Sequence, residues 1–228
     1  MKLRNILAVL AAGATMALPI TASAQFGGLV KQAVPGLGGK PAGAPAADID
    51  GFLANAMLST KNVMIASALL SAAVQKRTDN ADLKKQLADI SGKKSLKELN
   101  TYSAPMTNDI AAIANQKNAE AALSERYQSA TAEQKQMIAN ALVNLAIGIA
   151  RNVVLASQAP NMVSSLTGNP ANLGKLGEVK AAAELIAVQA KGLATIAPAL
   201  PKLMSSVKIK AETATATTPY KPVSADAI

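Results

Sequence analysis

The residue types that most often perform catalysis and bind metals are missing from this 228-residue sequence, which contains no His and no Cys. A disulfide, a zinc site built from Cys or His, a Cys nucleophile and a triad with a His base are therefore excluded. Only carboxylates, Lys and Tyr are left for acid–base chemistry. The sequence predicts a protein that is not an enzyme, with no catalytic residue, no metal site and no cofactor.

The carboxylates show no spacing that chemistry would require. Asp48 and Asp50 lie beside Gly51 and superficially match a calcium loop, but the glycine follows the second Asp directly, so the calcium-binding pattern is not met. A helix N-cap explains this pair better. Glu120 and Glu125 are five residues apart and do not share a helical face, and no Glu-x-x-His pair exists for a di-iron bundle.

Basic residues are concentrated between positions 76 and 97, where seven of them stand against three Asp, a local excess of +4. Such a surface could contact anionic lipid headgroups or an acidic glycan. The alternative, which we favour, is a solvated surface that keeps the protein soluble. Nucleic acid is not expected as a partner, because the aromatic residues that stack on single strands are missing. The candidate contact residues are Lys76, Arg77, Lys84, Lys85, Lys93, Lys94 and Lys97.

A second pattern lies in the most apolar helix that we expect, from 132 to about 157. Its polar residues recur every three or four positions and form one narrow stripe: Gln136, Asn140, Asn144, Gly148 and Arg151 or Asn152. We favour a stripe that faces solvent. The alternative is that Asn140, Asn144 and Arg151 line a polar seam between helices. Buried amides need hydrogen-bond partners, so the seam predicts matching polar groups opposite.

The N-terminus has the pattern of a bacterial secretory signal peptide. Lys2 and Arg4 precede an apolar stretch over 6–18, and an A-x-A cleavage site occupies 22–24. The mature chain is expected to begin at Gln25, in the periplasm or the medium. A transmembrane anchor is the alternative, but the apolar stretch is shorter than the roughly 20 residues that span a bilayer.

The rest of the alanine-rich chain divides into three segments. Residues 25–47 contain many Gly and Pro and predict a flexible arm, 48–208 predict one all-α domain, and 209–228 predict an extended or disordered tail. A tether or a partner-binding strand is the functional alternative for the tail. The domain is expected to be an antiparallel bundle of roughly four to six helices. The expected helices cover 48–76, 81–90, a short helix from Ser95, 106–129, 132–157 (ended or kinked by Pro160) and 176–197, with a last turn over 199–207.

Three functional hypotheses follow from these patterns. The leading one is an exported, non-enzymatic bundle of the bacterial envelope that binds a protein, a lipid or an envelope surface through a helix groove or its basic end. The alternative is a membrane-active or lipid-binding protein that inserts its apolar helices, 132–157 and 176–207, reversibly into a bilayer. The third is an enzyme that uses Lys or Ser. The sequence does not define the ligand or the oligomeric state.

Overall fold

The structure, a computed structural model, describes residues 48–77, 80–167, 170–209 and 214–223, so the expected signal peptide and arm lie outside the described residues. The described residues form an all-α bundle without strands, which confirms the predicted fold class. Eight α-helices lie in the described residues, more than the expected four to six. One expected helix is split into two, and several of the helices are short. The eight helices are α2 (Ile49–Val74), α3 (Ala81–Gly92), α4 (Leu96–Asn100), α5 (Ser103–Asn115), α6 (Ala119–Ser129), α7 (Ala132–Thr167), α8 (Leu176–Ile196) and α9 (Leu200–Ser206). A 3₁₀ helix, η1 (Pro170–Lys175), lies between α7 and α8.

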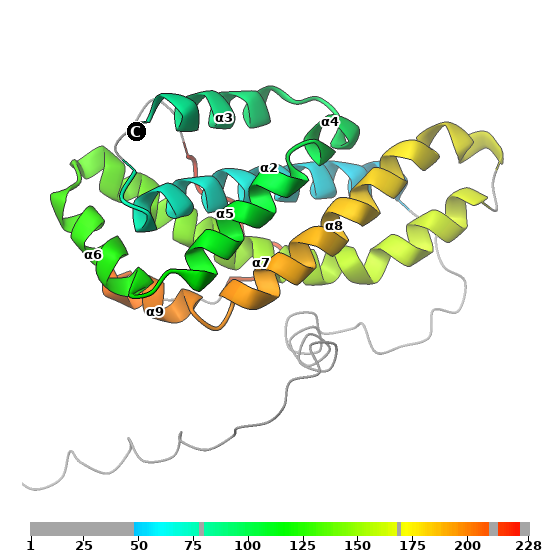
Figure 1. Cartoon of the computed structure of the whole chain (residues 1–228). Helices are drawn as coiled ribbons and strands as arrows, with labels where there is room; N and C mark the ends of the chain where they lie inside the picture. The colour runs from blue at the N-terminus through cyan, green and yellow to red at the C-terminus, as the bar shows by residue number, and fades with distance from the viewer. Residues whose placement is uncertain (1–47, 78–79, 168–169, 210–213, 224–228) are drawn as a thin grey trace, which may run out of the picture.

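Helix α2 runs through the middle of the bundle and packs against α7, α5 and α8 (Figure 1). Helix α7 runs antiparallel to α2, and α8 returns beside both of them (Figure 1). Helices α3 and α4 cover one side, while α6 and α9 pack together at one end. The core consists mainly of Leu, Ile, Val, Met and Ala side chains.

Small residues allow α2 and α7 to approach closely. A Cβ atom built on Gly148 of α7 would lie 2.5 Å from Val63 Cγ2 on α2, closer than real Cβ contacts come. Both Val63 and Ala56 of α2 are fully buried. Since protein interiors are packed without spare volume, this glycine sets the spacing of the two helices.

A buried hydrogen-bond network joins α2, α7 and α8 inside the core. Gln189 Nε2 donates to Thr60 Oγ1 at 2.7 Å. Asn152 Nδ2 donates to the Ile186 carbonyl at 3.2 Å and to Gln189 Oε1 at 3.4 Å. Asn152 therefore points into the bundle and does not belong to the polar stripe, which on α7 continues through Arg151.

Side chains cap the starts of α2 and α4. The Asp48 carboxylate accepts the Gly51 N–H at 2.8 Å, so this residue is an N-cap, as predicted. At the start of α4 the Glu98 N–H donates to Ser95 Oγ at 3.2 Å, but the Glu98 carboxylate accepts from the Lys94 N–H instead of that of Ser95. Only one of the two hydrogen bonds of a capping box is therefore formed at this helix start.

Two expected helix boundaries are wrong. The single helix expected over 106–129 is two helices, because Asn118 adopts a left-handed conformation (φ 62°) that separates α5 from α6. The helix expected over 132–157 continues without a break to Thr167, with Pro160 inside it. Proline removes one backbone hydrogen bond but does not end this helix.

Candidate functional site

The polar stripe of α7 binds the C-terminal residues 214–223, which we call the tail segment. The Asn144 side chain pairs with both backbone groups of Lys221: its Nδ2 donates to the carbonyl at 2.9 Å, and its Oδ1 accepts the N–H at 2.7 Å. Asn140 Nδ2 donates to the Pro222 carbonyl at 2.7 Å. The side chains of α7 thus form hydrogen bonds with the backbone of the tail segment, as the backbone of a neighbouring strand does in a sheet.

Arg151 extends this set of contacts by almost two helical turns. Its Nη2 donates to the Thr218 carbonyl at 2.9 Å. Asn140, Asn144 and Arg151 are spaced by four and seven residues and therefore lie on one face of α7. They span about 16 Å of helix at 1.5 Å per residue. The four residue steps from Thr218 to Pro222 span about 13 Å of extended chain, so the tail segment runs antiparallel to α7 with matching length.

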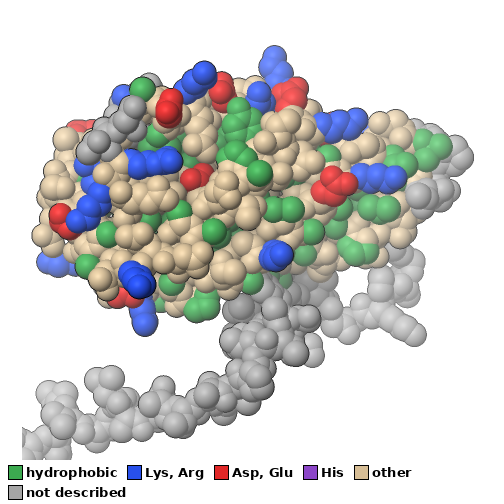
Figure 2. Space-filling view, viewed as in Figure 1, with side chains coloured by type: hydrophobic (Ala, Val, Ile, Leu, Met, Phe, Trp, Pro, Cys, Tyr) green, Lys and Arg blue, Asp and Glu red, His purple; other side chains and the backbone are tan. Residues whose placement is uncertain are grey.

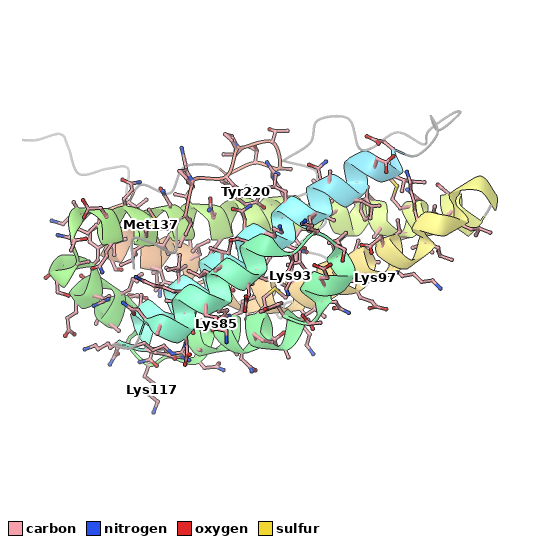
Figure 3. All side chains as sticks on the ribbon, turned by 90° about the horizontal axis from the view of Figure 1, so that it is seen from above. Lys85, Lys93, Lys97, Lys117, Met137 and Tyr220 are labelled. Carbon is pink, nitrogen blue, oxygen red and sulfur yellow. The ribbon has the colours of Figure 1, made fainter. Side chains whose placement is uncertain are left out.

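Tyr220 anchors the tail segment to α2 as well (Figure 3). Its hydroxyl donates to Ser59 Oγ at 3.0 Å, and Ser59 is buried on α2. The Arg151 guanidinium lies 4.5 Å from the centroid of the Tyr220 ring, within the range of a cation–π contact. Burial raises the pKa of Tyr220 above its ordinary value, so the phenol stays protonated and remains a donor. The contacts define a groove between α2 and α7.

The expectation that the stripe faces solvent is wrong for Asn140 and Asn144, which are 6% and 1% exposed. Gln136, at the end of the stripe, is exposed, and its Nε2 donates to Asn140 Oδ1 at 2.8 Å. That bond fixes the Asn140 amide with its Nδ2 toward the groove. The polar groups opposite the stripe come from the backbone of the tail segment, not from another helix. The sequence analysis missed Tyr220 and Lys221 as partners, although Pro219 and Pro222 favour an extended chain there.

The groove continues beyond the tail segment as a cavity of about 400 Å³. Asn55 of α2 and Arg151, Val154, Leu155 and Gln158 of α7 line it, together with Ala216 and Thr217 of the tail segment. A turn, in which the Thr218 N–H donates to the Thr215 carbonyl at 3.2 Å, bends the tail segment at this point. The buried Arg151 Nε has no hydrogen-bond partner among the described residues. The tail segment thus leaves this end of the groove unfilled.

The seven basic candidates lie on α3 and α4 and in the segments that precede these two helices. Figure 2 shows Lys and Arg side chains scattered over the visible face, with acidic side chains among them. Lys76 is paired with Glu125. Lys93 lies 5.5 Å from the ring centroid of Tyr102. The exposed members of the group are separated by acidic residues of the same helices, such as Asp82, Asp89 and Glu98. They are Lys76, Arg77, Lys84, Lys85, Lys94 and Lys97.

A buried carboxylate that the sequence analysis did not identify lies under α3. Asp109 of α5 is 9% exposed and accepts a hydrogen bond from Gln86 Nε2 of α3 at 3.2 Å. Burial raises the pKa of Asp109, and the hydrogen bond from Gln86 and the positive charge of Arg77 partly oppose this rise. Asp109 thus links α5 to α3 through Gln86.

Two helices of the described chain are long and apolar enough to cross a membrane, Ile49–Val74 and Ala132–Leu166. The bent pair formed by 173–196 and 200–206 passes the same test if it is counted as one span. Inside the bundle, 72% of the apolar window of the first helix and 56% of that of the second are buried. Most of the residues in these apolar windows are therefore part of the bundle interior.

No family model, no curated protein and no solved structure shows significant similarity to this chain.

Proposed function

We propose that this protein is an interaction protein that binds an extended polypeptide segment in the groove between α2 and α7. The observation that carries the proposal is the pairing of the Asn144 amide with both the N–H and the carbonyl of a single residue. Asn140 and Arg151 hold two more carbonyls of the same segment. Contacts of this kind recognise extended backbone, and side-chain pockets add specificity.

The chemistry of the groove supports binding rather than catalysis. Its polar groups are two amides, a guanidinium, a hydroxyl and a phenol whose raised pKa makes it a poorer base at neutral pH. No group of three or more acidic side chains suited to holding a metal occurs in the described part of the chain. We therefore assign the groove no catalytic step and no cofactor.

We further propose that the protein acts after export, in the bacterial periplasm or the medium. The support is the order of Lys2 and Arg4, the apolar stretch over 6–18 and the A-x-A site at 22–24. N-terminal sequencing of the protein from a bacterial host checks this. We expect a mature chain that begins at Gln25; a chain that keeps Met1 and stays in the cytoplasm would contradict export.

Selection from a phage-displayed peptide library tests the proposed binding. The target is the full chain with Lys221→Pro, because proline has no N–H for Asn144 Oδ1 and the groove therefore holds its own tail segment more weakly. We expect selected peptides to bind at least tenfold more weakly when Asn144→Ala is added. If no selected peptide depends on Asn144, the groove does not have this function.

A membrane-active protein is the second candidate, favoured by the length and apolarity of α2 and α7. Co-sedimentation with neutral and anionic vesicles tests it. Insertion of these helices predicts binding to both vesicle types that persists at physiological salt. Binding that needs anionic lipid and fades with salt would indicate docking of the basic residues instead. No sedimentation in any condition would exclude both membrane roles.

A further inference from the structure

We infer that the ligand of the groove is a segment of another polypeptide with the pattern Pro-Tyr-x-Pro, where x is any residue except proline, preceded by an apolar side chain. This inference rests on the proposed function. The tail segment has the Pro-Tyr-x-Pro part of the pattern in Pro219 to Pro222, and its bound conformation shows which features the groove recognises.

The tyrosine is recognised through both its ring and its hydroxyl. The ring lies against the Arg151 guanidinium, and the hydroxyl donates to the buried Ser59 Oγ. A phenylalanine would keep the ring contact but would leave Ser59 without this donor. Buried polar groups that lose a partner are costly, so the site discriminates in favour of tyrosine.

The two prolines and the residue between them follow from the backbone contacts. Pro219 and Pro222 restrict φ and favour an extended conformation in the free chain, which lowers the entropy lost on binding. Position x must keep its N–H, because Asn144 Oδ1 accepts it at 2.7 Å. The side chain at x is exposed, as that of Lys221 is, so its identity is free.

The unfilled end of the groove indicates that the ligand extends further than the tail segment does. The cavity presents the apolar side chains of Val154 and Leu155 between Asn55 and Gln158. The tail segment places only the small side chain of Ala216 and that of Thr217 at the cavity. A ligand with a larger apolar side chain in place of Ala216 would bury more apolar surface there. We expect such a ligand to displace the tail segment.

Fluorescence anisotropy with two labelled synthetic peptides tests this inference. One peptide has the sequence of residues 214–223, and the other carries the change Ala216→Leu, since Ala216 lines the cavity. Both are titrated with the full chain bearing Lys221→Pro, which we call an open-groove variant because its tail segment is held more weakly, and with the matched control Lys221→Ala, which keeps the N–H. Tyr220→Ala is a second open-groove variant, in which the anchor of the tail segment is removed.

We expect both open-groove variants to bind the 214–223 peptide at least tenfold more tightly than the Lys221→Ala control. The leucine peptide should bind about fivefold more tightly than the parent peptide, because it buries additional apolar surface. Changing its tyrosine to phenylalanine should weaken binding about tenfold.

Failure of the two peptides to bind either open-groove variant would overturn the inference about the ligand. If the library selection still gives Asn144-dependent peptides, only the Pro-Tyr-x-Pro pattern is wrong. If that selection also fails, the proposed function fails with it. Equal affinity of the two peptides would show that the cavity is not part of the ligand site.

Discussion

The groove between α2 and α7 and the basic surface of α3 and α4 are two polar regions with opposite organisation. In the groove, three side chains spaced by four and seven residues share one face and meet one extended segment. On the basic surface, seven residues that are close in sequence are distributed over three elements and separated by acidic side chains. Polar residues with helical spacing are therefore brought together on one face of α7. Basic residues that are merely close in sequence are not brought together in this way.

The two regions also differ in the environment of their polar groups. Asn140 and Asn144 are buried and their amides are paired, which makes each contact strong and specific. Most of the lysines of α3 and α4 are exposed, and exposed ion pairs contribute little. Changes in the groove should therefore have large effects, and changes on the basic surface small ones.

The largest effect is expected from Gly148→Ala. A new Cβ would meet Val63 Cγ2 at 2.5 Å, so the buried Val63 side chain must shift or α2 and α7 must separate. We expect the free energy of unfolding to fall by about 2 kcal/mol, as overpacked cores do. Chemical denaturation followed by circular dichroism measures it. Gly92→Ala at the end of α3 is the matched control, since nothing lies within 4 Å of a Cβ there; equal losses in the two variants would contradict the close approach.

Next in size is Asn144→Ala, which removes both hydrogen bonds to Lys221. We expect a loss of about 1 kcal/mol in stability, because the freed backbone groups of Lys221 are accessible to water. Denaturation of the full chain measures this loss. Asn161→Ala on the exposed side of the same helix serves as the control. Because alanine favours the helix more than asparagine does, the control should lose no stability. A loss as large in the control would contradict a role of the tail segment in the effect of Asn144→Ala.

Asp109→Asn is expected to stabilise the protein at neutral pH. Burial raises the pKa of Asp109, so the native state binds its proton more tightly than the unfolded state does. The native state therefore loses stability as the pH rises from the ordinary pKa of 3.8 through the raised value. Asparagine cannot ionise, so the advantage of the variant should grow from pH 3 to pH 7 in thermal melts. The exposed Asp82 gives the control Asp82→Asn; an advantage that does not change with pH would contradict the burial of an ionised Asp109.

The smallest effect is expected from the double change Lys84→Glu and Lys85→Glu on α3. Both side chains are exposed, and surface substitutions of this kind change stability by about 0.5 kcal/mol or less. Peptide binding in the groove should not change at all. A loss of peptide binding in this variant would mean that the basic surface and the groove act as one site.

The sequence allowed prediction of those features that depend on local chemistry. Helical periodicity gave the all-α class and the shared face of Asn140, Asn144 and Arg151, and the Asp48 cap followed from its residue type. The break at Asn118 was missed because one left-handed residue leaves no trace in the apolar pattern. The docking of the tail segment was missed because Asn144 and Lys221 are 77 residues apart, and no local signal encodes such a contact.

Amide hydrogen exchange of Lys221 in the full chain tests the central claim most directly. The N–H that Asn144 Oδ1 accepts should exchange at least about tenfold more slowly than an unprotected amide. In the Asn144→Ala variant the protection at Lys221 should disappear, while that of the core helices remains. Exchange of Lys221 at the unprotected rate in the unaltered protein would contradict the account, since the groove would not hold an extended segment.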